Sequence, residues 1–261
     1  MAGLERIQEM LRLCSTANRL FPATIFYNEG WLLRLVLDWF ARQPVGPHAL
    51  NFVRDARWFS EALLPSQFYP RDMGDQLAEG WTHADGVIGH VTIGDSALAD
   101  TKLVAGATQL VVTEAKLFSR LSARVKNAAY FDQAARNVAC IAEVLHRAQR
   151  RPEEFSSLGF LVIAPAEQIA QNLFTSELSV QSIEYKVSRR VCEYASPRRE
   201  TKEMWLHEWF LPTLRHIKIE SLSWEQIIDH IRSIDRDFES ELSDFYEHCL
   251  KFNRLQEREH V

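Results

Sequence analysis

An apolar run that ends in two opposite charges constrains this chain more than any other feature. The run spans residues 109–113 and is followed directly by Glu114, Ala115 and Lys116. Its leucine, valines and threonine predict a buried strand over 109–117. Because the side chains of a strand alternate between its faces, Glu114 and Lys116 point one way and Ala115 points the other, into a core that only a small residue fits easily. The sequence therefore places a carboxylate and an ammonium on one wall of a sheet.

A second acid occupies an upstream segment that also has the pattern of a strand. This segment, 81–91, carries Asp85 next to Gly86. If the two strands lie side by side, the carboxylates of Asp85 and Glu114 come about 5 Å apart, and one divalent cation can bridge them. The alternatives are a turn or strand-end aspartate at Asp85 and a surface ion pair between Glu114 and Lys116. The apolar strand around Glu114 does not suit an exposed edge, which favours the site.

Asp85 followed by Glu114-x-Lys116 resembles the motif of the PD-(D/E)xK nuclease superfamily, whose members include restriction endonucleases and the exonuclease domains of recombination and defence systems. The proline of that name is absent here, and His83, which precedes Asp85 in the same segment, is more simply interpreted as a strand histidine. The resemblance implies a restriction-endonuclease-like core over residues 25–164, a mixed sheet with the order α-β-β-β-α-β.

The same resemblance implies the chemistry of the site. Mg²⁺ or Mn²⁺ would be held by Asp85, Glu114 and the carbonyl of Ala115, with water completing an oxygen shell. Such an ion lowers the pKa of bound water and polarises a phosphate. Lys116 would orient or help to deprotonate the attacking water and offset the charge that grows on the phosphate. The expected activity is hydrolysis of phosphodiester bonds in nucleic acid, with DNA favoured over RNA as the substrate. The enzyme would act within a defence or mobile-element system.

Two further residues match places that superfamily members use. Glu29 lies in the first expected helix, which often supplies an extra carboxylate to the metal site, and the alternative is an exposed helix glutamate. Gln133 lies on the helix after the Lys116 strand, where exonuclease-type members carry a glutamine motif. The tyrosine of that motif is missing, since Asn137 stands in its place. Gln133 is carried over as a contact to the substrate or to the metal shell.

Periodicity and helix breakers predict the rest of the chain. We expect one domain, 1–261, with an α/β fold: a mixed central β-sheet flanked by helices, and a helix-rich C-terminal elaboration over 165–261. The expected helices cover 25–42, 50–64, 122–150, parts of 166–194, 200–211 and, after a capping box at Ser223, a final helix through 245. The expected strands cover 81–91 and 109–117, joined as a long hairpin, a buried strand 159–164 and a late strand 217–222.

Charge and cysteines narrow the class of protein. The formal net charge of −5 counts against a strongly basic nucleic-acid coat, although local basic stretches can still follow a phosphate backbone. Two stretches are candidates for this contact, and the alternative for each is a solvated face. The first contains Arg120, Arg124 and Lys126, and the second contains Arg189, Arg190, Arg198, Arg199 and Lys202. The four cysteines form no CxxC pair, which argues against zinc knuckles and disulfides and suits a reducing cytoplasm. No apolar run is long enough to span a membrane.

Several alternatives stay open at the level of sequence. Trp205, Trp209 and Trp224 form either a stacking platform for bases or part of the core, and their helical spacing favours the core. An alternative function is a nuclease-fold subunit that binds nucleic acid or stabilises a larger complex without catalysis. An active enzyme could still need a protein partner that supplies recognition, and it could act as an oligomer. No GxSxG, P-loop, HExxH or GxGxxG motif is present, so serine hydrolase, NTPase, zincin and Rossmann functions lack support.

Overall fold

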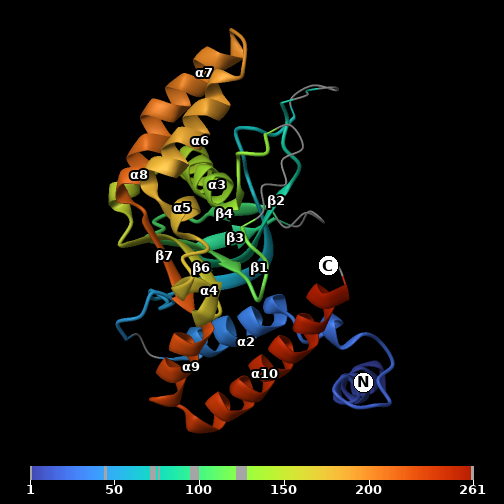
Figure 1. The fold of residues 1–261 in the computed structure, drawn as a ribbon. Helices are drawn as coiled ribbons and strands as arrows, with labels where there is room; N and C mark the ends of the chain where they lie inside the picture. The colour runs from blue at the N-terminus through green and yellow to red at the C-terminus, as the bar shows by residue number, and fades with distance from the viewer. Residues whose placement is uncertain are drawn as a thin grey trace.

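A mixed sheet lies at the centre of the computed structural model (Figure 1). The structure describes residues 2–43, 46–70, 75, 77–94, 100–121 and 128–259. Within these residues the sheet has five strands, in the order β1 (Arg57–Leu64), β2 (Thr82–Gly89), β5 (Gln109–Ala115), β6 (Ser157–Ala164) and β7 (Lys218–Ser223). β2 runs antiparallel to β1 and β5, whereas β6 runs parallel to β5 and β7. The expected α/β fold with a mixed sheet is confirmed.

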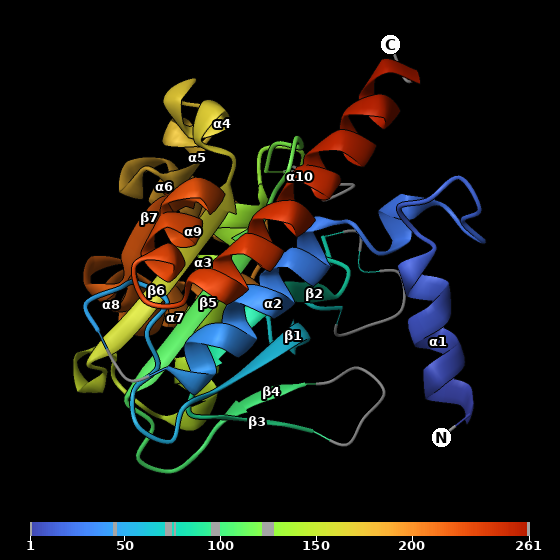
Figure 2. The same cartoon turned by 90° about the horizontal axis from the view of Figure 1, so that it is seen from below.

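Helices cover both faces of this sheet. On one side lie α3 (Gln133–Ala148), α6 (Val180–Cys192), α7 (Arg198–Trp205) and α8 (Leu211–His216). Figure 2 shows the helices that lie across the other face, which are α2 (Glu29–Arg42), α9 (Trp224–Arg232) and α10 (Arg236–Glu259). Each layer has its own apolar cluster, so the sheet is buried on both sides. The helical C-terminal part that the sequence predicts is also confirmed.

Shorter elements make up the rest of the described chain. They are α1 (Ala2–Arg12), η1 (Ala23–Ile25), η2 (Pro152–Glu154), α4 (Ala166–Ala170), α5 (Thr175–Leu178) and the π-helical turn η3 (Leu206–Phe210) between α7 and α8. The connection from β2 to β5 contains a second sheet, in which β3 (Val91–Ile93) pairs with β4 (Thr101–Leu103). Among the residues described, no helix is both long enough and apolar enough to cross a membrane.

The central strands are apolar because both of their faces are covered. In β5, Val112 packs into the cluster on the α3 side and Val111 into the cluster on the α2 side. Phe160 and Leu161 repeat this division in β6. Such runs are stable only in the middle of a sheet, away from water. The charged end of β5 is therefore held at the carboxyl edge of the most buried part of the fold.

Side-chain caps decide where the two helices nearest that edge begin. The side chain of Asn28 accepts a hydrogen bond of 3.0 Å from the N–H of Trp31, so α2 starts after Asn28 and not at residue 25. Asp132 caps α3 in the same way, so the expected start of this helix at residue 122 is wrong. Residues 122–127 lie outside the described part of the chain. Both helices consequently begin beside the end of β5.

Two other expected helices are wrong. The segment 50–64 contains β1, because the edge of β2 offers strand hydrogen bonds to residues 57–64 and this pairing overrides the local helical pattern. The final helix does start at the capping box of Ser223, but it is two helices, α9 and α10. Asp235 separates them, and its carboxylate accepts a hydrogen bond of 3.1 Å from the N–H of Phe238 at the start of α10.

The three tryptophans Trp205, Trp209 and Trp224 are buried, so the interpretation as core residues is confirmed. Trp205 and Trp209 belong to the cluster on the α3 side, and Trp224 belongs to the cluster on the α2 side. None of the three is placed to stack on a base from solution.

Candidate active site

β2 and β5 separate at the end of their shared ladder, and the expected acids lie at this point. The last paired residues are Gly86 and Thr113, so the next positions along the two strands are Asp85 and Glu114. There the backbone N–H of Ala115 donates a hydrogen bond of 2.8 Å to Oδ2 of Asp85. The Asp85 side chain thus takes the place of a carbonyl of a neighbouring strand and satisfies a buried donor.

Glu114 accepts hydrogen bonds from three side chains. Its Oε1 atom is 2.6 Å from Nζ of Lys116 and 2.5 Å from Nε2 of Gln133, and its Oε2 atom is 3.3 Å from Nδ2 of Asn137. Gln133 and Asn137 are one helical turn apart in the first turns of α3, so both amides reach the same carboxylate. The side chains of Glu114 and Lys116 are only 2% and 9% exposed. The structure therefore brings these residues into one buried arrangement.

Burial makes the two carboxyls difficult to ionise together. Burial first, and then the charge of Asp85, raise the pKa of Glu114 to about 7, although the ammonium of Lys116 opposes both effects. Burial also raises the pKa of Asp85, against the effects of Lys116 and of the N–H of Ala115. Two carboxyls in such a place share a proton near neutral pH unless a further positive charge joins them. A divalent cation would supply that charge.

Oxygen donors on two strands make up the candidate metal site. Asp85 and Glu114 supply carboxylates, which Mg²⁺ and Mn²⁺ prefer, so the residues present fit such an ion. Glu29 begins α2, close enough for its charge to raise the pKa of Asp85. In the part of the chain that the structure describes, no group of three or more His, Cys, Asp or Glu side chains is arranged to hold a metal. A ligand role for Glu29, or for the carbonyl of Ala115, stays a prediction.

The alternation of side chains between the two faces of the sheet is interrupted in β1 and in β2 beside Asp85. Two pairs of their ladder, Phe59 with Val87 and Ala62 with Ala84, pack toward the same cluster on the α3 side. Residues three apart in a regular strand lie on opposite faces, so the alternation shifts by one residue in each strand. The shift coincides with Glu61, whose φ of 56° is left-handed. The pleat is therefore interrupted at the level of the candidate site.

Sequence reasoning missed three residues that lie beside the site. Nε1 of Trp224 donates a hydrogen bond of 2.8 Å to the carbonyl of Lys116, and no local pattern announces this contact. Asn137 could have been found, because helical spacing places it on the same face as Gln133. Glu61 was hidden because its segment has a helical pattern. His83 is exposed, and its Nδ1 atom lies 3.0 Å from the carbonyl oxygen of Glu61, which agrees with the interpretation as a strand histidine.

The second basic stretch is partly buried. Arg190 pairs with Glu79 at 3.8 Å and with Glu193 at 2.8 Å, and it has no exposed side-chain surface. Lys202 is also buried and donates to the carbonyl of Gln67. The expectation that these two cations follow a phosphate backbone is wrong, because their helices turn them toward the core.

Other basic residues do face solvent. Arg189 lies over the ring of Tyr130, with its guanidinium carbon 3.8 Å from the ring centroid, near the start of α3. Arg120 is exposed just beyond the candidate site, whereas Arg124 and Lys126 fall outside the described residues.

Comparisons with protein-family models, with curated proteins and with solved structures found no match to this chain. Asp85, Glu114 and Lys116 are therefore assigned to a candidate site from their own geometry and electrostatics. This site differs from an ordinary surface ion pair, because the ammonium of Lys116 is buried and the side-chain amides of Gln133 and Asn137 also contact the carboxylate of Glu114.

Proposed function

We propose that this protein is a metal-dependent nuclease of the PD-(D/E)xK type that hydrolyses phosphodiester bonds in DNA. One observation carries the proposal: Asp85 and Glu114 converge where β2 and β5 separate, with Lys116 Nζ only 2.6 Å from Glu114. The order of α2, β1, β2, β5, α3 and β6 along the chain supports it, since this order is that of a restriction-endonuclease-like core.

Each residue has a task in the proposed reaction. Asp85, Glu114 and the carbonyl of Ala115 would hold Mg²⁺ or Mn²⁺, which supplies a water of lowered pKa and a polarised phosphate when bound. Lys116 would direct its ammonium at the phosphoryl oxygens, where negative charge grows in the transition state. The same ammonium would orient the attacking water.

Surrounding residues hold these groups in position. Gln133 and Asn137 fix the carboxylate of Glu114 through their amides, as second partners of metal ligands commonly do. Trp224 fixes the backbone of Lys116 from the opposite face of the sheet. A strand end that is held from both faces keeps the reacting groups in a narrow range of positions.

A cleavage assay with matched variants tests the proposal. Linear duplex, circular duplex, single-stranded DNA and RNA are incubated with Mg²⁺ or Mn²⁺ and wild-type protein, Glu114→Gln or Lys116→Met. We expect cleavage by wild type and a loss of about 100-fold or more in each variant. The controls are Lys218→Met and Glu220→Gln, which alter another Lys–Glu pair of the same sheet, 2.9 Å apart on β7, and should leave cleavage unchanged.

The outcomes separate the possible functions. If both Glu114→Gln and Lys116→Met cleave nucleic acid as wild type does, Glu114 and Lys116 are not the active site. Binding of nucleic acid without cleavage by wild type, in every metal and substrate, would favour the non-catalytic subunit, whose acids serve packing. A nuclease that acts within a complex would gain cleavage when the purified protein is supplemented with its partner.

A further inference from the structure

The sheet ends at β7, and no strand of the described residues pairs with the outer edge of β7. This strand pairs with β6 over six residue pairs and is the last one in the sheet (Figure 1). A pocket of about 390 Å³ and another of about 550 Å³ lie against it, and Glu220 lines both of them. Of the side chains of β7, only that of Ser223 is buried. The edge of β7 is therefore open to a further strand.

The other edge of the sheet is protected. In β1, Glu61 is left-handed with φ of 56° and interrupts the strand, and Leu63 forms a bridge with Asp100 along the outer edge. Interruptions and covering segments of this kind keep the edges of sheets from pairing with other chains. β7 contains no proline, no glycine and no left-handed residue, and its ladder with β6 is unbroken. Its backbone is therefore regular enough to accept another strand.

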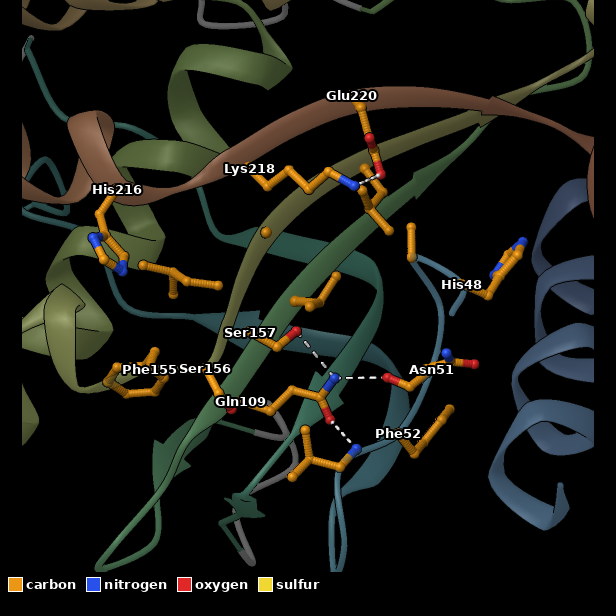
Figure 3. Close-up of a pocket in the computed structure, with 16 residues that line it drawn as sticks. His48, Asn51, Phe52, Gln109, Phe155, Ser156, Ser157, His216, Lys218 and Glu220 are labelled. Atoms are coloured by element: carbon orange, nitrogen blue, oxygen red, sulfur yellow. Dashed lines mark hydrogen bonds and ion pairs between the residues drawn. The ribbon is translucent and has the colours of Figure 1, made fainter. Parts of the chain in front are cut away.

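One face of β7 carries two opposite charges. Lys218 and Glu220 are two residues apart, so they project from the same face of the strand. Both line the pocket of Figure 3, in which Nζ of Lys218 lies 2.9 Å from Oε1 of Glu220. A lysine on an edge strand usually discourages pairing, because a second strand would bury its charge without a partner. Here the compensating charge stands at the next position on the same face.

Antiparallel pairing of β7 with a second copy of itself sets these charges opposite each other. If the two-fold axis passes at Ile219, Lys218 of each copy faces Glu220 of the second copy, and the four charges alternate in sign. Pairing centred on Glu220 would instead place two carboxylates opposite each other. Pairing centred on Ser221 would place the carboxylate of Glu220 opposite Leu222. The charges therefore favour the register that is centred on Ile219.

The other face of β7 favours the same register. Ile219 is partly buried against the cluster on the α3 side, and it lines the pocket of about 550 Å³ together with Ile169 and Phe174. In the register centred on Ile219, this side chain meets Ile219 of the second copy. Directly opposed apolar side chains stabilise a pair of strands. Charge thus meets opposite charge on one face, and an apolar side chain meets an apolar side chain on the other.

We propose that a second copy of this chain pairs with β7, antiparallel and centred on Ile219, so that the two sheets form one continuous sheet. β5, β6 and β7 are parallel within each copy, and the two β7 strands run in opposite directions. The carboxyl ends of the two β5 strands, and with them the two candidate sites, therefore lie at opposite edges of the joined sheet. Each copy keeps a complete site, so cleavage does not depend on this dimer.

Charge reversal tests the register, with sedimentation velocity as the measurement. Wild type should be a dimer at micromolar concentrations. Lys218→Glu and Glu220→Lys should each weaken the dimer about 100-fold or more, because like charges then face each other. An equimolar mixture of the two variants should form a heterodimer, since the acids of one chain face the lysines of the other. Lys102→Glu is the matched control, because Lys102 also pairs with an acid two residues away, Asp100 at 3.3 Å, and it should leave the dimer intact.

Disulfide cross-linking provides a second measurement that does not alter a charge. The variants are made on a Cys192→Ser background, since Cys192 is exposed. Ile219→Cys places two cysteines directly opposite each other, with Cα atoms about 4.5–5.5 Å apart, within reach of a disulfide. Ser221→Cys is the matched control on the same face, because the proposed register offsets its two copies by about 13 Å along the strands. In a glutathione redox buffer, only Ile219→Cys should form a covalent dimer.

The results distinguish this proposal from the proposed function. A wild-type protein that stays monomeric would overturn the β7 dimer, and so would a dimer that survives both charge reversals or cross-links through Ser221→Cys. If wild type cleaves nucleic acid as a monomer, the dimer is wrong and the nuclease stands. If Ile219→Cys cross-links and the two charge variants form a heterodimer while no nucleic acid is cleaved, the dimer stands and the nuclease fails.

Discussion

Glu61 lies opposite Asp85 across β1 and β2, between the ladder pairs Ser60 with Gly86 and Ala62 with Ala84, and its backbone is left-handed with φ of 56°. The charge of Glu61 raises the pKa of Asp85. The carboxylate of Glu61 also lies 3.5 Å from the guanidinium of Arg34 on α2. Left-handed residues other than glycine are strained, and such strain is concentrated at functional sites. The break in the pleat at this position is more simply explained by the placement of Asp85.

Replacement of Glu61 separates backbone strain from charge. Glu61→Gly should be more stable than Glu61→Ala by about 1 kcal/mol, because glycine adopts the left-handed conformation without the steric cost that alanine retains. Both variants lose the carboxylate, so their difference reports the backbone alone. Urea unfolding at pH 7 gives the two free energies of unfolding. Equal stability would mean that the left-handed conformation at this position is not costly.

Gly86 is the position at which α2 packs on β2 beside the site. A methyl group there would lie 2.4 Å from Oγ1 of Thr113 and 3.0 Å from Cδ1 of Leu37. Gly86→Ala should therefore destabilise the protein by about 1–3 kcal/mol through overpacking. Gly80→Ala is the matched control, since a methyl group at Gly80 has no heavy atom within 4 Å among its surroundings. Thermal unfolding of the two variants checks the prediction, and equal melting temperatures would contradict it.

Metal binding should depend on pH through Glu114. Its pKa is raised to about 7, so the carboxylate is ionised at pH 8 and protonated at pH 6. A proton competes with the metal for the carboxylate, and the affinity for Mn²⁺ should therefore fall as the pH is lowered. We expect an affinity about tenfold lower at pH 6 than at pH 8, measured by calorimetry in the absence of nucleic acid.

Glu114→Gln is the control for this titration. The variant should bind Mn²⁺ weakly at every pH and should lose most of the dependence between pH 6 and pH 8. An affinity in wild type that is constant over this range would show that Glu114 does not ligate the ion.

The buried pair of Glu79 with Arg190 should contribute far more to stability than a surface pair. Glu79 also lies 3.7 Å from Arg136, and its side chain is almost fully buried. At pH 8 it is ionised, because burial raises its pKa only to about 7. Glu79→Ala would leave two buried arginines without this carboxylate and should cost about 3–5 kcal/mol.

An exposed ion pair of the same helical layer is the reference for that measurement. Glu203 pairs with Arg199 at 2.7 Å, and both side chains are exposed. Glu203→Ala should cost less than about 1 kcal/mol. Urea unfolding at pH 8 gives both free energies of unfolding, and similar losses in the two variants would mean that water reaches Arg136 and Arg190.

The central strands and the positions of their charged residues could be predicted because strand periodicity is local. The apolar runs that contain β5 and β6 are visible without any partner, and the alternation of side chains puts Glu114 and Lys116 on one face. The capping box at Ser223 is likewise complete within a few residues, and it starts α9 as predicted. Gln133 could be predicted from its position on the helix that follows the strand of Glu114 and Lys116.

The segment 57–64 could not be predicted because its strand exists only through β2. Its own residues, among them Glu61 and Ala62, are compatible with a helix, and the ladder with β2 decides the matter. The burial of Arg190 and Lys202 in the second basic stretch could not be predicted for a related reason. A sequence shows that Arg190 and Lys202 are charged, but only the packing of their helices shows that they are buried.

The sequence by itself determined the strand that ends in Glu114 and Lys116, the presence of Asp85 in a second strand, and the class of fold, because each follows from side-chain period and composition over short stretches. The tertiary structure alone decided that β2 and β5 separate at Gly86, and that the carboxylate of Asp85 accepts a hydrogen bond from the N–H of Ala115. These features depend on where strands from distant parts of the chain stop pairing, and that balance of hydrogen bonds and packing is set by the whole fold.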